Sequence, residues 1–116
     1  MIKRAPRKAP DAIPVQDQVF ELAAEVFRVM SAPMRLKIIS SLCQREKNVT
    51  ELLSEIDTTQ PNMSQHLNIL YQAGVLAKRR EGVQIHYRII DEQVASLCRT
   101  VCAQMAIEVR DSASQG

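Results

Sequence analysis

Short polar side chains are concentrated in one segment of the chain, between residues 59 and 68. Amide and hydroxyl groups occur there at Thr59, Gln60, Asn62, Ser64, Gln65 and Asn68. Such groups both donate and accept hydrogen bonds, which is what base edges in the major groove of DNA require of a protein. His66 lies in the same segment and is a further candidate contact. The segment therefore favours recognition of bases.

A run of cations follows this polar segment. Lys78, Arg79 and Arg80 precede Gly82, in a stretch whose two-residue alternation is typical of a β-hairpin. A basic hairpin can contact the phosphate backbone or enter a minor groove, and Gln84 on its polar side joins the candidate DNA contacts. Each feature alone also fits a solvated helix face or a protected edge strand. Their order along the chain favours DNA binding.

Three cysteines form the other group that could do chemistry. Cys98 and Cys102 are four residues apart and so share one face of a helix, whereas Cys43 comes much earlier in the chain. Thiols can be oxidised or persulfidated, or can bind soft ions such as As(III) and Cd(II). Because Cys98 and Cys102 share their face with apolar residues, plain packing also fits them.

Helices must position these side chains. Apolar residues recur at three- and four-residue spacing over residues 17–30, 33–45, 49–56 and 59–73, which predicts four helices. Pro33 suits the first turn of the second helix, and Asn48 and Glu51 have the spacing of a capping box that opens the third. Thr58 or Thr59 can cap the fourth helix, and Gly74 suits its end.

Two strands and a last helix complete the predicted order. Residues 75–80 and 83–89 alternate as a hairpin, and residues 91–109 carry one apolar stripe. We therefore predict a mainly α fold with a β-hairpin wing, a winged helix-turn-helix with four helices, two strands and a fifth helix. Residues 1–15 are expected to form a flexible basic, Pro-rich arm, residues 16–110 a DNA-binding and dimerisation domain, and residues 111–116 a frayed tail.

Composition narrows the class of protein. The chain has 116 residues, of which 46% are hydrophobic, enough for one domain with a core. The chain contains no uninterrupted stretch of about 18 apolar residues, so no membrane-spanning helix is expected. The number of cysteines is odd and no export signal is visible, which favours reduced thiols in the cytoplasm. Residues 58–90 carry four basic groups and one acidic group, which favours a polyanionic partner. An enzyme is disfavoured, because no phosphate loop, carboxylate pair or nucleophile–His arrangement is evident.

Segments spread over the chain resemble the ArsR/SmtB family of small bacterial winged-helix repressors. The likeness covers about residues 17–108 and rests on residues 30–39, 49–52, 60–67, 74–76 and 79–82, with Tyr87 and Arg88. The Pro-Met-Arg-Leu sequence from Pro33 and the Ser-Gln-His-Leu sequence from Ser64 are its most specific parts. The resemblance implies a homodimer, paired through helices 17–30 and 91–109, that binds operator DNA and leaves it when an inducer arrives. Its two reading helices would lie about one DNA turn apart.

Members of the family differ in the site that binds the inducer, and only the thiol-based kind of site has candidate residues in this chain. Metal sensors that carry Cys-x-Cys near the start of the third helix differ from this chain, where residues 48–52 contain no thiol. Sensors that carry Asp-x-His near the start of the last helix differ too, because the only histidines here are His66 and His86. His86 falls on the polar face of its strand and is expected to be exposed.

Sulfide-responsive members of the family pair a thiol of the second helix with one of the last helix. The matching positions here are Ser40 and Ala106, but Cys43 and Cys102 lie three and four residues from them in opposite directions. In antiparallel helices these shifts nearly cancel, so Cys43 and Cys102 could still face each other. The resemblance implies that Cys43, Cys98 and Cys102 sense an inducer by thiol redox or reactive sulfur chemistry, with no required cofactor. An As(III)- or Cd(II)-responsive repressor and an inducer-independent regulator are the alternatives.

Overall fold

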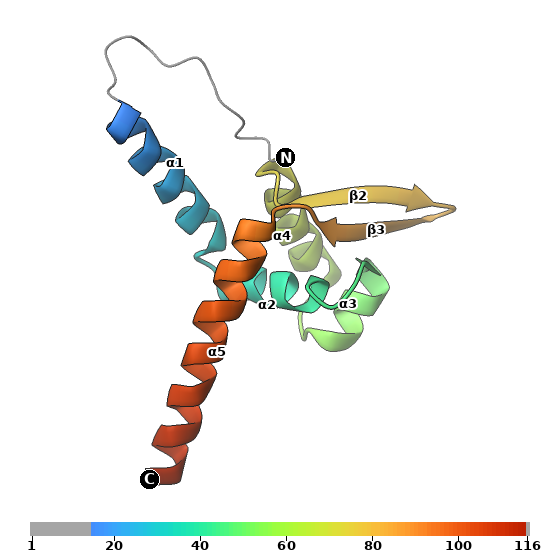
Figure 1. Cartoon of the computed structure of the whole chain (residues 1–116). Coiled ribbons are helices and arrows are strands. Elements are labelled where there is room, and N and C mark those ends of the chain that lie inside the picture. Colours follow the sequence, from blue (N-terminus) through green and yellow to red (C-terminus); the bar gives the residue numbers. More distant parts are fainter. Residues whose placement is uncertain (1–14, 116) are drawn as a thin grey trace.

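The structure is a computed structural model that describes residues 15–115 (Figure 1). Its elements are α1 (Val15–Met30), α2 (Pro33–Leu42), β1 (Lys47–Asn48), α3 (Val49–Glu55), α4 (Gln60–Gln72), β2 (Leu76–Glu81), β3 (Gln84–Ile89) and α5 (Glu92–Gln115). This order confirms the predicted winged helix-turn-helix. The predicted N-terminal arm lies outside the described residues, except that Val15 already begins α1.

The helix ends follow the capping residues in the sequence. Asn48 accepts a hydrogen bond from the Glu51 N–H and the Glu51 side chain accepts one from the Asn48 N–H, which confirms the capping box. Thr59 caps α4 by accepting from the Asn62 N–H. The Asp91 carboxylate accepts from the backbone N–H groups of residues 93 and 94 at the start of α5. Gly74, at φ 80°, ends α4 in the left-handed region that favours glycine.

The sheet has one more strand than the sequence predicted. Its order is β1-β3-β2, with all pairs antiparallel, and Lys47 lies opposite Tyr87 on the inner strand. β1 is only two residues long, too short to leave an alternating pattern in the sequence. The wing, residues 76–89, closes where Glu81 faces Gln84, and Gly82 takes φ 64° in this two-residue turn.

The core lies where α2, α4 and α5 pack together at the base of the wing. Its least exposed apolar side chains come from α2, α3, α4, β2 and α5, and include Ile38, Ile39, Leu52, Met63, Leu67, Leu70, Leu76 and Val94. Burial of each such side chain contributes roughly 1.5–3 kcal/mol relative to exposure. Because three of them lie on α4, the core determines which face of this helix is buried.

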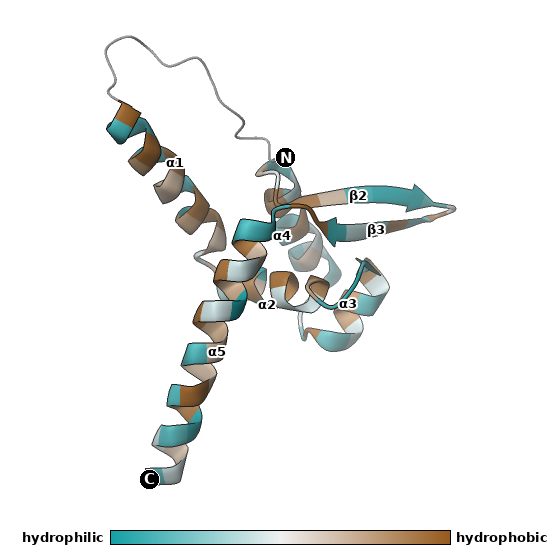
Figure 2. Cartoon of the chain, viewed as in Figure 1, coloured by the Kyte–Doolittle hydropathy of each residue, from teal (hydrophilic) through white to brown (hydrophobic). Residues whose placement is uncertain are grey.

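The helices α1 and α5 extend away from the other elements, and both carry hydrophobic residues along their length (Figure 2). On α1, Phe20 is 71% exposed and Phe27 58% exposed, and on α5, Met105 is 47% exposed. The tail predicted to fray from residue 111 is helical through Gln115, since neither Pro nor Gly interrupts residues 92–115. None of the helices within residues 15–115 is long and apolar enough to cross a membrane.

Candidate nucleic-acid interface and thiol cluster

The fourth helix separates its side chains into a buried and an exposed set. Met63, Leu67 and Leu70 are completely buried, which confirms them as anchors in the core. The exposed residues of α4 are Gln60, Pro61, Ser64, Gln65, Asn68 and Gln72. Gln60, Ser64 and Asn68 follow each other at four-residue intervals and so form one polar row along the helix. This row can reach base edges if α4 enters a major groove.

Two of the predicted contacts also build the start of α4. Thr59 is exposed, and its Oγ1 accepts from the Asn62 N–H at 3.2 Å. The Asn62 side chain donates to Thr58 Oγ1 at 2.9 Å. Substituting Thr59 or Asn62 therefore changes the helix N-terminus as well as any contact with DNA.

His66 is turned partly toward the protein body. Its Nδ1 lies 3.1 Å from Nη1 of Arg35 on α2, and the side chain is half-buried. Burial and then the Arg35 charge lower the pKa of His66 below its ordinary value. The imidazole is thus a neutral partner of Arg35, a role that its position in the polar segment did not reveal.

The cations of the wing are exposed but already engaged. Arg79 donates to both carboxylate oxygens of Glu46, with Nη2 2.7 Å from Oε2 and Nε 3.0 Å from Oε1. These hydrogen bonds hold the pKa of the Glu46 carboxyl below its usual range. Lys78 Nζ lies 4.3 Å from the centre of the Tyr71 ring, and Arg80 donates to the Gly82 carbonyl. All three cations can still turn toward a polyanion, because exposed pairs of this kind are weak.

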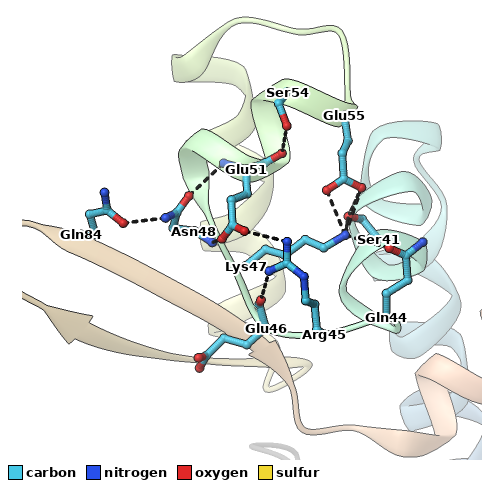
Figure 3. A network of polar contacts seen from close by, with 10 residues as sticks. All are labelled: Ser41, Gln44, Arg45, Glu46, Lys47, Asn48, Glu51, Ser54, Glu55 and Gln84. Carbon is cyan, nitrogen blue, oxygen red and sulfur yellow. Dashed lines mark hydrogen bonds and ion pairs between the residues drawn. The ribbon is translucent and has the colours of Figure 1, made fainter.

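Gln84 connects the wing to the helix-turn-helix (Figure 3). Its Oε1 accepts from the Asn48 side chain at 2.5 Å, so β3 is tied to the residue that caps α3. His86, predicted to be exposed, is only 15% exposed and lies 3.4 Å from Glu81 on the paired strand. The third strand explains the difference, because β1 covers the edge of β3 beside His86.

A buried lysine, Lys47, lies close to this connection, and no pattern in the sequence indicates its burial (Figure 3). Lys47 is 2% exposed, and its ammonium donates to Ser41 at 2.8 Å, to Gln44 at 3.0 Å and to Glu55 at 3.0 Å. It thereby joins the end of α2 to the end of α3. A lysine that stands between charged or polar residues in the sequence is expected to be exposed to solvent. Only the fold shows the acceptors that surround this one.

The three cysteines gather where α5 packs on α2. Cys98 is 1% exposed, and its Sγ lies 3.8 Å from Cys102 Sγ and 3.8 Å from the Leu36 carbonyl oxygen. Cys43 follows the last residue of α2, and its Sγ lies 3.5 Å from Arg99 Nη1. Burial, followed by the hydrogen bond with Cys102, raises the pKa of the Cys98 thiol to about 12. Cys98 is therefore protonated at neutral pH and is a poor nucleophile.

This cluster does not match a three-ligand metal site within one chain. Among the residues that the structure describes, no three His, Cys, Asp or Glu side chains converge closely enough to hold a metal ion. Soft metalloids prefer two or three thiolates, and only Cys98 and Cys102 have sulfurs in direct contact.

Known proteins are similar to this chain in both sequence and structure. Residues 32–78 match the family of bacterial regulatory proteins called the arsR family. The transcriptional regulator KmtR of Mycobacterium tuberculosis is 40% identical over 88 residues, which cover 76% of this chain and 66% of KmtR. The repressor SmtB of the same organism is 34% identical over 84 residues, 62% of its length. The chain thus spans about two thirds, or slightly less, of the length of these relatives.

Two solved structures cover nearly the whole of their own chains. The crystal structure of Rv0081 from M. tuberculosis superposes with a TM-score of 0.68 and 33% identity, covering 82% of this chain and 96% of that one. The transcriptional repressor BigR from Xylella fastidiosa superposes with a TM-score of 0.66 and 30% identity, covering 76% and 93%. Together with the polar row of α4 and the wing, these matches show that the chain belongs to the ArsR/SmtB family of winged helix-turn-helix transcriptional regulators.

Proposed function

We propose that the protein is a dimeric transcriptional repressor that binds operator DNA through α4 and the wing. The observation that carries this proposal is the polar row Gln60, Ser64 and Asn68, held outward by three buried anchors beside an exposed basic hairpin. The row offers donors and acceptors to bases, while Arg79 and its neighbours offer charge to phosphates. The match to KmtR and to the repressor BigR supports regulation of transcription.

The proposed dimer forms through α1 and α5. Both helices expose apolar side chains, among them Val19, Phe20 and Phe27 on α1 and Met105 on α5. A groove of about 350 Å³ between α1 and the start of α5 is lined mainly by apolar residues and can receive such side chains from a second copy. A two-fold dimer would then present two copies of α4 about one DNA turn apart.

The DNA-reading roles can be tested with two substitutions. Gln65→Ala should reduce discrimination between an operator and random DNA by an amount on the order of 1–3 kcal/mol. Arg79→Ala should weaken binding to both duplexes and lower the salt slope by about one. Binding is measured by fluorescence anisotropy over a range of salt concentrations, with a duplex selected from a random library by the wild-type protein. Equal effects of both substitutions on both duplexes would contradict the assigned roles.

We further propose that the thiol cluster releases the operator when it is oxidised. With hydrogen peroxide, the Cys102 thiolate would attack one oxygen and expel hydroxide, giving a sulfenic acid. The Cys98 sulfur would then form the S–S bond and displace hydroxide, which leaves with the Cys98 proton as water. The sulfurs would move from 3.8 Å to about 2.05 Å apart, which distorts α5 beside the Leu36 carbonyl of α2. The sequence-based hypothesis paired Cys102 with Cys43 instead, and Cys43, at the end of α2, is the second candidate partner.

A soft metalloid is the second candidate inducer, because Cys98 and Cys102 already place two sulfurs side by side. Since no third ligand converges on them among residues 15–115, a third thiolate would have to come from the facing subunit.

One experiment separates these inducers. Peroxide, a persulfide donor, arsenite and cadmium are added separately to the operator complex of the wild type and of the variants Cys43→Ser, Cys98→Ser, Cys102→Ser and the triple variant. Oxidative sensing predicts that peroxide or the persulfide donor weakens wild-type binding at least about tenfold, roughly 1.4 kcal/mol, and that the triple variant does not respond. Release by arsenite or cadmium alone would favour the metalloid. A triple variant that responds like the wild type would refute thiol sensing altogether.

A further inference from the structure

One arginine connects three helices of the fold. Arg35 lies on α2, and its Nε donates to the Val29 carbonyl in the last turn of α1 at 2.6 Å. Its Nη1 lies 3.1 Å from Nδ1 of His66, near the middle of α4. A single half-buried side chain thus joins the proposed dimerisation helix to the proposed reading helix.

The chemistry of this bridge is specific. A guanidinium only donates hydrogen bonds, so Nδ1 of His66 must accept and the imidazole proton must lie on Nε2. The planar guanidinium holds its Nε–H and Nη1–H groups in a fixed fork, which sets the direction from the Val29 carbonyl to His66. Lysine, with a point charge on a flexible chain, cannot fix both directions at once.

Direct packing between α1 and α4 is slight in the part of the chain that the structure describes. α1 packs on α2, and α2 packs on α4 and α5 (Figure 1). Near its end, α4 also approaches α1, because Val26 and Val29 line a small cavity together with Ala73. Near the middle of α4 the link to α1 includes α2, where Arg35 has hydrogen-bond contacts to both helices.

We propose that Arg35 is a positioning residue that sets the operator half-site spacing which the dimer accepts. This inference rests on the proposed function, because it requires a dimer built on α1 that reads DNA with α4. Moving the half-sites by one base pair changes their separation by about 3.4 Å and rotates one relative to the other by roughly 35°, so each α4 has to shift by about 1.7 Å and turn by roughly 17°. In the absence of the Arg35–His66 contact, α4 can make such a shift, and the dimer then accepts neighbouring spacings.

The test compares variants that remove or keep the contact. Arg35→Lys keeps the charge but loses the fork, and His66→Leu removes the acceptor. His66→Asn is the matched control, because its Oδ1 stands near the position of Nδ1 and can accept from Arg35. Each full-length protein is titrated against a duplex selected from a random library, against the same duplex with its half-sites moved by one base pair either way, and against random DNA.

We expect the wild type and His66→Asn to lose on the order of tenfold in affinity when the spacing changes by one base pair. For Arg35→Lys and His66→Leu the loss should shrink to about threefold or less, while the affinity of Arg35→Lys, which keeps the charge and lies outside the candidate DNA contacts, stays within about twofold of the wild type for random DNA. A merely structural role would lower thermal stability without changing the spacing preference. Spacing preference retained in Arg35→Lys, or lost in His66→Asn, overturns the inference. If the wild type prefers no sequence over random DNA, the proposed function fails instead, so the two failures are distinguishable.

Discussion

Replacing Asn48 by alanine should destabilise the protein, because this one side chain serves two elements. Its Oδ1 accepts from the Glu51 N–H at 2.8 Å and caps α3, while its Nδ2 donates to Gln84 on the wing at 2.5 Å. The return bond of the capping box, from the Asn48 backbone N–H to Glu51, does not need the side chain and remains in the variant.

The expected magnitude follows from these two losses. An N-cap side chain contributes about 1 kcal/mol, with a range of roughly 0.5–2. The bond to Gln84 is exposed, so its net contribution lies near the lower end of the range for hydrogen bonds, about 0.5 kcal/mol. Asn48→Ala should therefore cost about 1–1.5 kcal/mol, which for a domain of this size lowers Tm by roughly 4–12 °C.

Two control variants separate the cap from the wing contact. Asn48→Ser keeps a hydroxyl acceptor for Glu51 but cannot reach Gln84, so it should cost about 0.5 kcal/mol. Gln84→Ala removes only the wing contact and should cost about the same. The assay is urea unfolding followed by far-UV circular dichroism at one fixed subunit concentration, with an unchanged m value as the test of comparable states. An Asn48→Ser variant as unstable as Asn48→Ala would refute the assignment of most of the energy to the cap.

Three further predictions follow from the buried groups. Glu55→Ala should destabilise the protein more than Lys47→Met does, as measured by urea unfolding. Loss of Glu55 leaves the buried ammonium of Lys47 without its counterion, whereas loss of the Lys47 charge leaves the Glu55 carboxylate within reach of water. The reverse ranking of the two variants would contradict this reasoning. The pKa of His66 is lower in the folded protein than the value of about 6.5 expected in the unfolded chain. Between these two pKa values the unfolded chain binds a proton at His66 more readily than the folded protein does, so the free energy of unfolding falls as the pH drops through this window. Thermal melts should show this slope in the wild type and lose it in His66→Asn. The pKa of Cys98, raised to about 12, predicts that it is the slowest of the three cysteines toward iodoacetamide near pH 8, and equal alkylation rates by mass spectrometry would count against its burial.

Local sequence signals determined the helices and the polar row of α4. The capping box at Asn48, the Thr59 cap and Gly74 after α4 act within a few residues of each other, so their chemistry is readable from the sequence. The spacing of Met63, Leu67 and Leu70 likewise fixes which side of α4 is buried, and with it which side chains remain exposed for the proposed contacts with DNA.

The tertiary structure decided what each of these side chains meets. It buried Lys47 among acceptors from two helices, paired Arg79 with Glu46 across 33 residues, and turned His66 toward Arg35 across 31 residues. It also placed Cys98, whose sulfur the helix already holds beside that of Cys102, against the Leu36 carbonyl of α2. A polar or charged side chain finds its partner only when distant segments are brought together, and the sequence carries no period that marks such pairs. The sequence by itself therefore determined the family and the helix proposed to read DNA. The packing of α2 against α4 and α5 decided which of its side chains stay exposed for the proposed contacts and which hold the helices in place.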